Sequence, residues 1–315
     1  APARRCAALA GGREAGTTGR DRTIDGRRQA PVGVYAERMP FDFDAAVQAP
    51  FRMQPGLRRM APGSAHLTPL APGSRHQREK LAVLSAYAPQ ALLEREGFDA
   101  RPALAALACH AAEEHTQAFT WDGAQAEAVH LGTAVRGSEV QQTAPGRFGL
   151  GDEVARCLRG LPAEWRLAGL LSLAFAEDFA IVDARDGTIP WLAVALPSQW
   201  APEEKVGRHF AQVHAPVADN TLLLRAAESL LRLVTGPERW ERFVWTITDH
   251  PRLHAHPERL ASPRWQATPV QRAWFRSERQ TFIPLPGLGQ ALYAIEVDVQ
   301  PLADVVASPA RAAAL

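Results

Sequence analysis

The chain has 315 residues, of which 46% are hydrophobic and 22% are charged, and its formal net charge is +1. This composition excludes fibrous, collagen-like and wholly disordered proteins, and the lack of a basic stripe argues against a nucleic-acid partner. The three cysteines show no CxxC spacing and are too few for a disulfide framework or an iron–sulfur centre. Because no apolar run approaches the ~20 residues of a membrane-spanning helix, we expect a cytoplasmic protein without a membrane partner.

The first part of the chain differs in composition from the rest. Residues 1–38 are rich in Arg, Gly and Ala and show no hydrophobic periodicity. We expect either a disordered leader or sequence upstream of a true start at Met39. Pro-Gly pairs recur at three places within residues 40–75, which predicts an extended, turn-filled arm over a core.

Hydrophobic spacing and proline positions predict four elements between this arm and residue 160. They are a helix over 76–96 that its proline interrupts, a helix over 102–119, a short strand over 128–135 and a short helix over 152–160. The second helix is expected to begin at Pro102, because proline suits the first turn of a helix.

The second half of the sequence predicts a sheet with helices. Apolar runs at 179–182 and 191–196 flank Asp186-Gly187, a turn pair that indicates a β-hairpin. The elements expected after it are helices over about 203–212 and 220–234 and strands over 242–248, 273–283 and 291–299. This order predicts an α+β fold, in which a pocket lies between the sheet and the helices on its face.

One pair of potential metal ligands lies on a predicted helix. His110 and Glu114 are four residues apart, and His115 lies beside them. Such a spacing places two ligands on adjacent helix faces. No third ligand is apparent in the sequence, so a polar helix face is the simpler interpretation.

His214 stands at the end of the predicted 203–212 helix. It leads into Ala215-Pro216-Val217, and a rigid proline exit fixes the imidazole. A large flat cofactor needs aromatic walls and one fixed imidazole, and several tryptophans occur upstream and on the later strands. This pattern alone still favours a structural histidine over a ligand.

A polar cluster interrupts the predicted strand over 273–283. Alternation sends Arg276, Glu278 and Gln280 to one face of the strand and Ser277 and Arg279 to the other. Either one face borders a polar pocket, or the charges protect an edge strand from pairing. Both interpretations remain open at this point.

Five short segments together resemble the catalytic, heme-binding alpha subunit of heme-dependent oxidative N-demethylases. They are Ala176-Glu177-Asp178-Phe179, Leu196-Pro197-Ser198-Gln199-Trp200, Glu204-Lys205-Val206-Gly207, Val213-His214-Ala215-Pro216-Val217 and Ser277-Glu278-Arg279-Gln280-Thr281. Their order and spacing also match. The resemblance implies a PAS-like α+β fold, with an antiparallel sheet, helices packed on one face and an N-terminal helical and extended arm.

The resemblance also implies domain limits. A single PAS-like heme-binding catalytic domain would span 39–305, with the arm and helices in 39–150 and the core in 151–305. Residues 306–315 would form a disordered tail.

The activity that the resemblance implies is a monooxygenase-type reaction with heme b. A small methylated amine, such as dimethylamine, would be oxidised by O₂ to formaldehyde and the demethylated amine. Electrons would come from NADPH through flavin and iron–sulfur centres on reductase subunits of a hetero-oligomer, in agreement with this chain's lack of a dinucleotide fingerprint. The alternative is a non-catalytic, PAS-like heme or small-molecule sensor.

The resemblance assigns roles to three residues. His214 is expected to be the axial ligand of the heme iron, and Arg279 and Lys205 are expected to neutralise the heme propionates. Glu278 is expected to face away from the pocket if Arg279 faces it, so no catalytic residue is assigned.

The chain departs from the family pattern at three places. They are Phe282-Ile283-Pro284 in place of basic Arg-Leu-Pro, Val244-Trp245 in place of Asn-Trp, and Val217-Ala218 in place of Val-Pro. These differences indicate either a divergent member with another substrate or one that binds heme without turnover.

Overall fold

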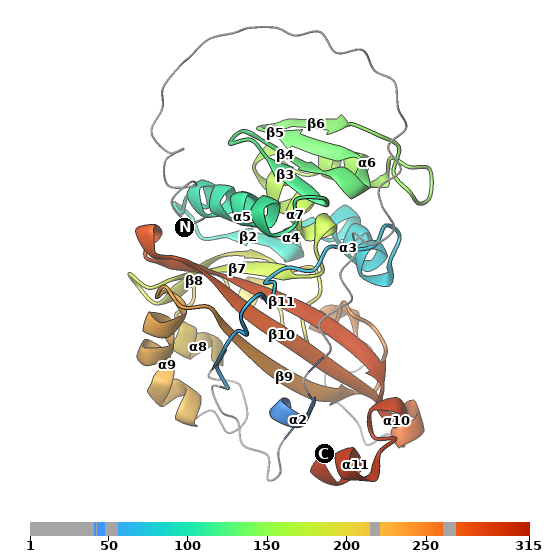
Figure 1. Ribbon diagram of the computed structural model, residues 1–315, viewed down its shortest axis with the longest axis vertical. Coiled ribbons are helices and arrows are strands. Elements are labelled where there is room, and N and C mark those ends of the chain that lie inside the picture. Colours follow the sequence, from blue (N-terminus) through green and yellow to red (C-terminus); the bar gives the residue numbers. More distant parts are fainter. Residues whose placement is uncertain (1–40, 42, 48–55, 215–220, 261–268) are drawn as a thin grey trace, which may run out of the picture.

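The computed structural model describes residues 41, 43–47, 56–214, 221–260 and 269–315. The leader expected at 1–38 lies outside these residues. At the centre is an antiparallel sheet of seven strands in the order β1-β9-β10-β11-β7-β8-β2 (Figure 1). The strands are β1 (Arg58–Arg59), β2 (Leu92–Glu94), β7 (Asp178–Asp183), β8 (Thr188–Ala193), β9 (Trp240–Thr248), β10 (Trp274–Leu285) and β11 (Gln290–Pro301).

The predicted hairpin and the three C-terminal strands are confirmed. β7 and β8 pair through a turn in which Gly187 takes a φ of 67°, a left-handed conformation that favours glycine. β10 and β11 pair along their whole length, from Trp274 opposite Pro301 to Leu285 opposite Gln290. The mixture of helices and an antiparallel sheet confirms the α+β class.

Helices cover both faces of this sheet, which corrects the expectation that they pack on one face (Figure 1). Helices α3 (Arg75–Ala86), α5 (Arg101–Glu114), α6 (Glu153–Gly160) and α7 (Arg166–Ala174) lie on one side, and α8 (Phe210–His214) and α9 (Thr221–Val234) on the other. Phe179 and Ile181 belong to the large core that includes α5 and α7, whereas Ala180 and Leu192 belong to a second apolar cluster. Because β7 and β8 are apolar on both faces, both faces need a cover.

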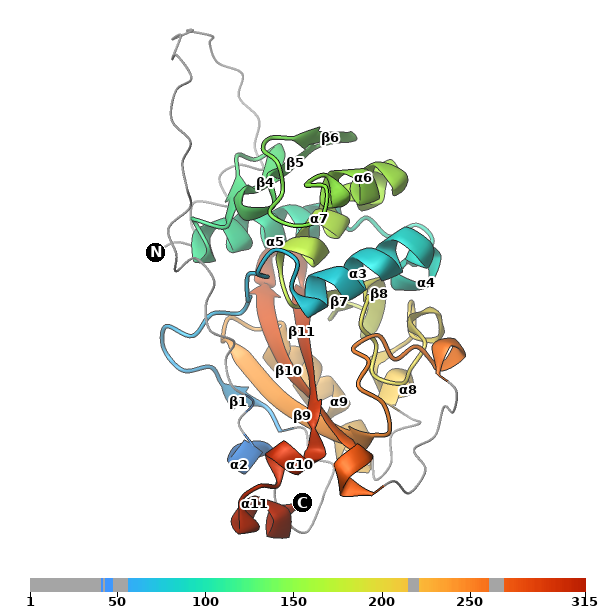
Figure 2. The same ribbon diagram turned by 90° about the vertical axis from the view of Figure 1, so that its right-hand side faces the viewer.

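A second, smaller sheet lies beyond the helical layer (Figure 2). Its strands, in spatial order, are β3 (Phe119–Trp121), β4 (Gln125–Ala128), β5 (Thr133–Arg136) and β6 (Glu139–Gln142). The sequence predicted only one strand in this region. The indole rings of Trp165 and Trp191 stack with centroids 5.5 Å apart and ring planes 19° apart. This stack joins the turn before α7 to strand β8.

Two predicted helices differ from the structure. The helix expected over 76–96 divides into α3, a short α4 (Ala88–Ala91) and strand β2. The helix expected over 203–212 is wrong, because Pro202–Glu204 forms a 3₁₀ turn and α8 begins only at Phe210. Gly207 lies between them with a φ of 73°, which no helix accommodates.

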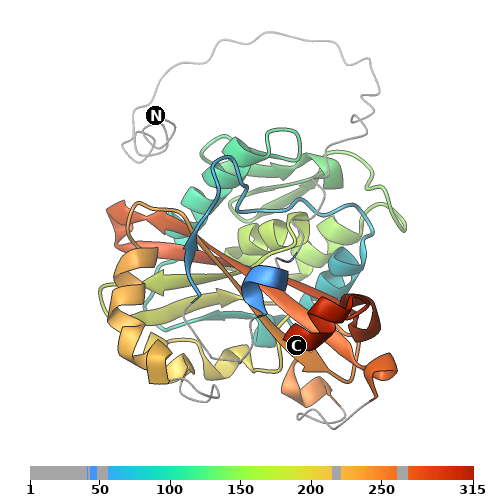
Figure 3. The same ribbon diagram turned by 60° about the horizontal axis from the view of Figure 1, so that its bottom comes forward.

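The structure also differs from the sequence-based expectation at the C-terminal end of the described chain. Residues 309–314, expected to be disordered, form α11 (Pro309–Ala314) after α10 (Leu302–Val305). Both lie beside α2 (Phe43–Ala46) at one end of the long strands (Figure 3). Phe43, Phe275, Leu302 and Val305 form a small apolar cluster there. Among the helices that the structure describes, none is long and apolar enough to cross a bilayer.

Residues 56–74, here called the crossing segment, run across β10 and β11 on the side of α5 (Figure 2). At one end Arg58 and Arg59 pair with the edge of β9. Further along, the amide of Leu70 donates to the carbonyl of Ala174 (2.9 Å), and Thr68 accepts from Ala176 (2.9 Å). These backbone bonds join the crossing segment to the end of α7.

Candidate functional site

A cavity of about 570 Å³ lies between the sheet and helices α8 and α9. This volume is typical of pockets for cofactors and small molecules. Aliphatic and aromatic side chains line most of it, among them Val182, Leu192, Phe210, Leu231 and Phe282. They come from β7, β8, β10 and both helices, so the cavity lies between two layers that bury their apolar faces against it.

Four polar residues of the cavity lie on the strands of the sheet. Arg242, Glu278 and Gln280 come from β9 and β10, and Tyr293 comes from β11. Gln280 lies opposite Arg242 in the strand register, and Glu278 lies two residues from Gln280 on the same face. Alternation along the strands therefore collects these side chains on one wall.

Glu278 is held in place by two donors. The hydroxyl of Ser198 donates to Glu278 Oε1, and Nε2 of Gln280 donates to Oε2 at 2.6 Å. Ser198 in turn accepts from Arg276 Nε at 2.7 Å. Two hydrogen bonds orient the carboxylate before any ligand arrives, which is the arrangement expected of a preorganised site.

Arg276 holds the loop that carries Ser198. Its side chain is buried, and Nη2 donates to the carbonyls of Leu196 (3.1 Å), Pro197 (3.0 Å) and Leu253 (2.7 Å). Burial lowers the pKa of Arg276 to about 10, so the guanidinium is still charged at neutral pH. The loop after β8 is thereby fixed against the sheet.

Gln199 lines the same cavity with an unusual backbone. Among the described residues it is the one non-glycine with a positive φ, 62°. Its amide donates to the carbonyl of Ala255 at 2.9 Å, which holds the loop in this conformation. A non-glycine residue in the left-handed region is uncommon, and such residues cluster at binding sites.

Two buried polar atoms on the cavity wall have no hydrogen-bond partner. They are Nε of Arg242 and Oε1 of Gln280. An unsatisfied buried polar group is unfavourable by about 1–3 kcal/mol, so its retention here indicates a ligand with polar groups. Burial, and then the Glu278 carboxylate, raise the pKa of Tyr293, which stays a protonated phenol.

Lys205 and His214 lie near each other in this region. Lys205 lines the cavity, and its ammonium donates to the carbonyl of Val213 at 2.9 Å. Burial lowers the pKa of Lys205. His214 directly follows Val213, which also lines the cavity, and it ends α8. The side chain of His214 lies outside the described part of the structure.

Arg279 lies on the face of the sheet away from the cavity. Its guanidinium pairs with Glu241 at 3.1 Å and donates to the carbonyl of Ala65 at 2.8 Å. Glu278 lines the cavity and Arg279 does not, so the expected placement of these two neighbours was wrong. The alternation was predicted correctly, but its phase was not, since both faces of β10 carry buried polar residues.

Several cavity residues were not predicted from the sequence. Arg242 and Tyr293 were not singled out, and Ser198 and Gln199 appeared only within a longer segment. Arg242 had a usable signal, because it is a charged residue in a strand that pairs with the polar part of β10. Gln199 had no such signal, because the identity of a residue does not reveal a strained backbone conformation.

A family model described as "Haem-dependent oxidative N-demethylase, alpha subunit-like" matches residues 156–315. The chain belongs to this family. Every described residue that lines the cavity, apart from Leu57, lies within the matched range. The family is heme-dependent by its description, and the term alpha subunit indicates a protein of several subunits. A search of curated proteins found no match to this chain.

The cavity suits a heme in its walls and in its charges. The walls are apolar over most of their area, and the cations of Arg242 and Lys205 can meet the two propionates. Among the described lining residues there is no imidazole, thiolate or thioether to bind iron. Tyr293 could ligate only as a phenolate, which its raised pKa opposes.

Proposed function

We propose that this chain is the catalytic, heme b-binding subunit of a monooxygenase-type N-demethylase for a small methylated amine, such as dimethylamine. The observation that best supports this proposal is Glu278, the one carboxylate among the described residues that line the cavity. Small alkylamines are cationic at neutral pH, and a fixed carboxylate in an apolar site attracts them strongly. The apolar walls favour methyl groups over larger polar substituents.

Each residue of the wall has a distinct part in this proposal. Glu278 binds the ammonium N–H and can accept its proton, so that the neutral amine is the form that is oxidised. Ser198 and Gln280 hold the carboxylate in one orientation. The bound heme supplies oxygen activation, which no side chain provides. The apolar walls keep water away from the reacting methyl group.

For the cofactor itself, we propose His214 as the axial ligand and Arg242 and Lys205 as the partners of the propionates. Lys205 is bonded to the carbonyl directly before His214, so one cation both lines the cavity and fixes the end of α8. Arg242 replaces Arg279 in this role, because Arg242 lines the cavity and has an unpartnered Nε.

The electrons are proposed to come from NADPH through flavin and iron–sulfur centres on reductase subunits in the cytoplasm. The family description supports partner subunits in general terms. The sequence supports the same division, since it contains no P-loop and no third glycine at dinucleotide spacing.

The test measures formaldehyde from the heme-loaded chain, reduced chemically in air in the presence of dimethylamine. For Glu278→Gln we expect the KM for the amine to rise at least tenfold, because a charge-assisted hydrogen bond is worth about 1.5–3 kcal/mol. The Soret band should not change. Glu228→Gln is the matched control, because Glu228 is an exposed carboxylate of α9.

A heme sensor would behave differently in the same assay. It would show a Soret band and amine-dependent spectral shifts but no formaldehyde beyond a heme-only blank. That result with several methylamines would reject the enzymatic proposal in favour of the sensor.

A further inference from the structure

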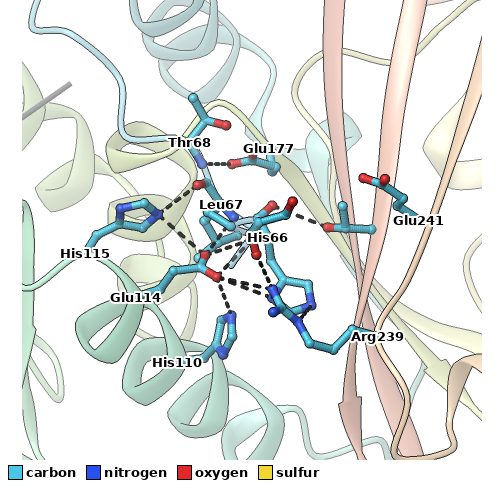
Figure 4. A network of polar contacts seen from close by, with 12 residues as sticks. His66, Leu67, Thr68, His110, Glu114, His115, Glu177, Arg239 and Glu241 are labelled. Carbon is cyan, nitrogen blue, oxygen red and sulfur yellow. Dashed lines mark hydrogen bonds and ion pairs between the residues drawn. The ribbon is translucent and has the colours of Figure 1, made fainter. Parts of the chain in front are cut away.

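A cluster of two histidines and a glutamate joins the crossing segment to helix α5 (Figure 4). His66 comes from the crossing segment, and His110 and Glu114 lie one turn apart on α5. His66 Nδ1 is 3.4 Å from Glu114 Oε1, and His110 Nε2 is 3.6 Å from the same oxygen. The three ligand atoms lie within 4.8 Å of one another. We propose that these residues bind a divalent first-row metal ion, and zinc is the ion that fits them best.

The spacing is that of metal ligands more than that of hydrogen-bond partners. Zinc ligands at ~2.0–2.2 Å in a tetrahedron lie about 3.3–3.6 Å from one another. A good N–H to O hydrogen bond has a donor–acceptor distance of about 2.7–3.2 Å. Nε2 of His110 is also buried and makes no hydrogen bond. Two of the three pairs of ligand atoms therefore have the separation of zinc ligands, and one of the imidazole nitrogens has no hydrogen bond.

The carboxylate of Glu114 is held in one orientation by the crossing segment. The amides of His66 and Leu67 donate to Glu114 at 2.9 Å and fix the carboxylate. Such contacts orient metal ligands.

Arg239 is the natural competitor for this site. Its Nε is 3.3 Å from His66 Nε2, and its Nη2 is 3.2 Å from His66 Nδ1. A neutral imidazole accepts a hydrogen bond at only one of its ring nitrogens. A metal ion at Nδ1 therefore requires the guanidinium of Arg239 to leave that nitrogen. The Arg239 side chain is 38% exposed and also donates to the carbonyl of Ser64, so a bound ion would have to displace it toward solvent.

The ligand set favours zinc with one open position. Two imidazoles and one carboxylate are a ligand set of zinc sites in which water takes the fourth place. Among the described residues, no fourth histidine, cysteine or acid belongs to the cluster. His115 is engaged elsewhere, because its Nε2 lies 2.7 Å from the carbonyl of Leu67. A bound ion would cross-link the crossing segment to α5. The site lies outside residues 156–315 and does not depend on the proposed function.

The test uses the full chain after treatment with a chelator, titrated with Co²⁺ and then with Zn²⁺. We expect one Co²⁺ per chain, with the visible absorption of a four-coordinate ion that Zn²⁺ abolishes. His110→Ala should weaken binding about 100-fold, because one of three protein ligands is lost. Arg239→Gln should tighten binding about tenfold, because a competing cation is removed. His250→Ala, which removes a partly buried histidine outside the cluster, should bind like the wild type.

Two results would overturn the metal site. One is no saturable binding by either the wild type or Arg239→Gln. The other is stoichiometric binding that persists in both His110→Ala and Glu114→Gln. Circular dichroism checks the fold of each variant. His110 has 24% of its side chain exposed, so it is the ligand whose loss disturbs packing least. Cobalt and zinc are counted separately from iron, so the heme content does not affect the outcome.

Discussion

Glu177 is a carboxylic acid buried beneath the crossing segment. Its Oε2 accepts from the amide of Thr68 at 3.0 Å, while Oε1 has no hydrogen-bond partner. Burial, and then the charge of Glu296, raise the pKa of Glu177 to about 8. The folded protein therefore holds this proton more tightly than the unfolded chain does. The stabilisation is complete below the ordinary pKa of a glutamate and is lost as the pH rises towards 8.

We predict that Glu177→Gln removes much of this pH dependence. The amide oxygen can still accept from Thr68, but it carries no charge at any pH. The melting temperature of the wild type should fall between about pH 5 and about pH 9, and that of the variant should fall less, because each shifted pK unit is worth about 1.4 kcal/mol. Thermal unfolding across this range is the measurement. Parallel curves for the two proteins would contradict the prediction.

Two glycines of the small sheet allow a test at the level of an element. Gly132 and Gly137 have φ values of 59° and 55°, so both are left-handed. A Cβ at Gly132 would lie 2.2 Å from the carbonyl oxygen of Ala144, whereas a Cβ at Gly137 would have no atom within 4 Å. The two positions therefore share the same backbone strain and differ only in close approach.

We predict that Gly137→Ala destabilises the protein by about 1–2 kcal/mol, the effect of a left-handed alanine. Gly132→Ala should destabilise it further, because the backbone at Ala144 must also move. Denaturant unfolding of both variants gives the comparison. Equal losses of unfolding free energy in the two variants would mean that the backbone at Ala144 moves away from a Cβ at position 132 without an energetic cost.

The sequence predicted elements best where local chemistry decided them. Asp186-Gly187 between apolar runs was sufficient for the β7–β8 hairpin, because the turn type demands those residues. The small sheet was mostly missed, because its strands are three or four residues long and too short to show alternation. The helix expected at 203–212 failed because glycine at 207 takes a left-handed conformation that composition alone does not reveal.

The candidate site was predicted only in part for a related reason. Lys205 lines the cavity, and its role toward a propionate stays a prediction, but Glu278 and Arg279 were exchanged between the two faces of β10. Alternation gives the relative orientation of neighbours, not which face meets the cavity. Hydrophobicity usually decides that question. Here it does not, because the opposite face also buries Glu241 and Arg279 as an ion pair.

At the scale of the molecule, the matched family range shares its core with the first half of the chain. Residues 156–315 include the strands of the central sheet, but the large core also contains Leu84, Leu104 and Phe119. They pack in the same cluster as Phe179 and Trp191. The apolar face of β7 and β8 is therefore covered by the first half of the chain.

We predict that residues 156–315 alone do not unfold cooperatively, because the uncovered face of the sheet exposes a large apolar surface. A broad thermal transition and binding of a hydrophobic dye would show this. The matched control is residues 39–315, which retain all the described elements and should melt at the temperature of the full chain. A sharp transition for 156–315 would mean that the family range folds by itself.

The stacked rings of Trp165 and Trp191 join the turn before α7 to strand β8, within residues 156–315. Indoles 5.5 Å apart with nearly parallel planes couple their electronic transitions. The near-ultraviolet circular dichroism of the protein therefore carries a signal from this one contact. Trp200 lies on the cavity wall, where a bound porphyrin would quench its fluorescence. The circular dichroism of this stack and the emission of Trp200 thus provide two separate optical signals. The first reports the packing of the turn before α7 on β8, and the second reports the filling of the cavity.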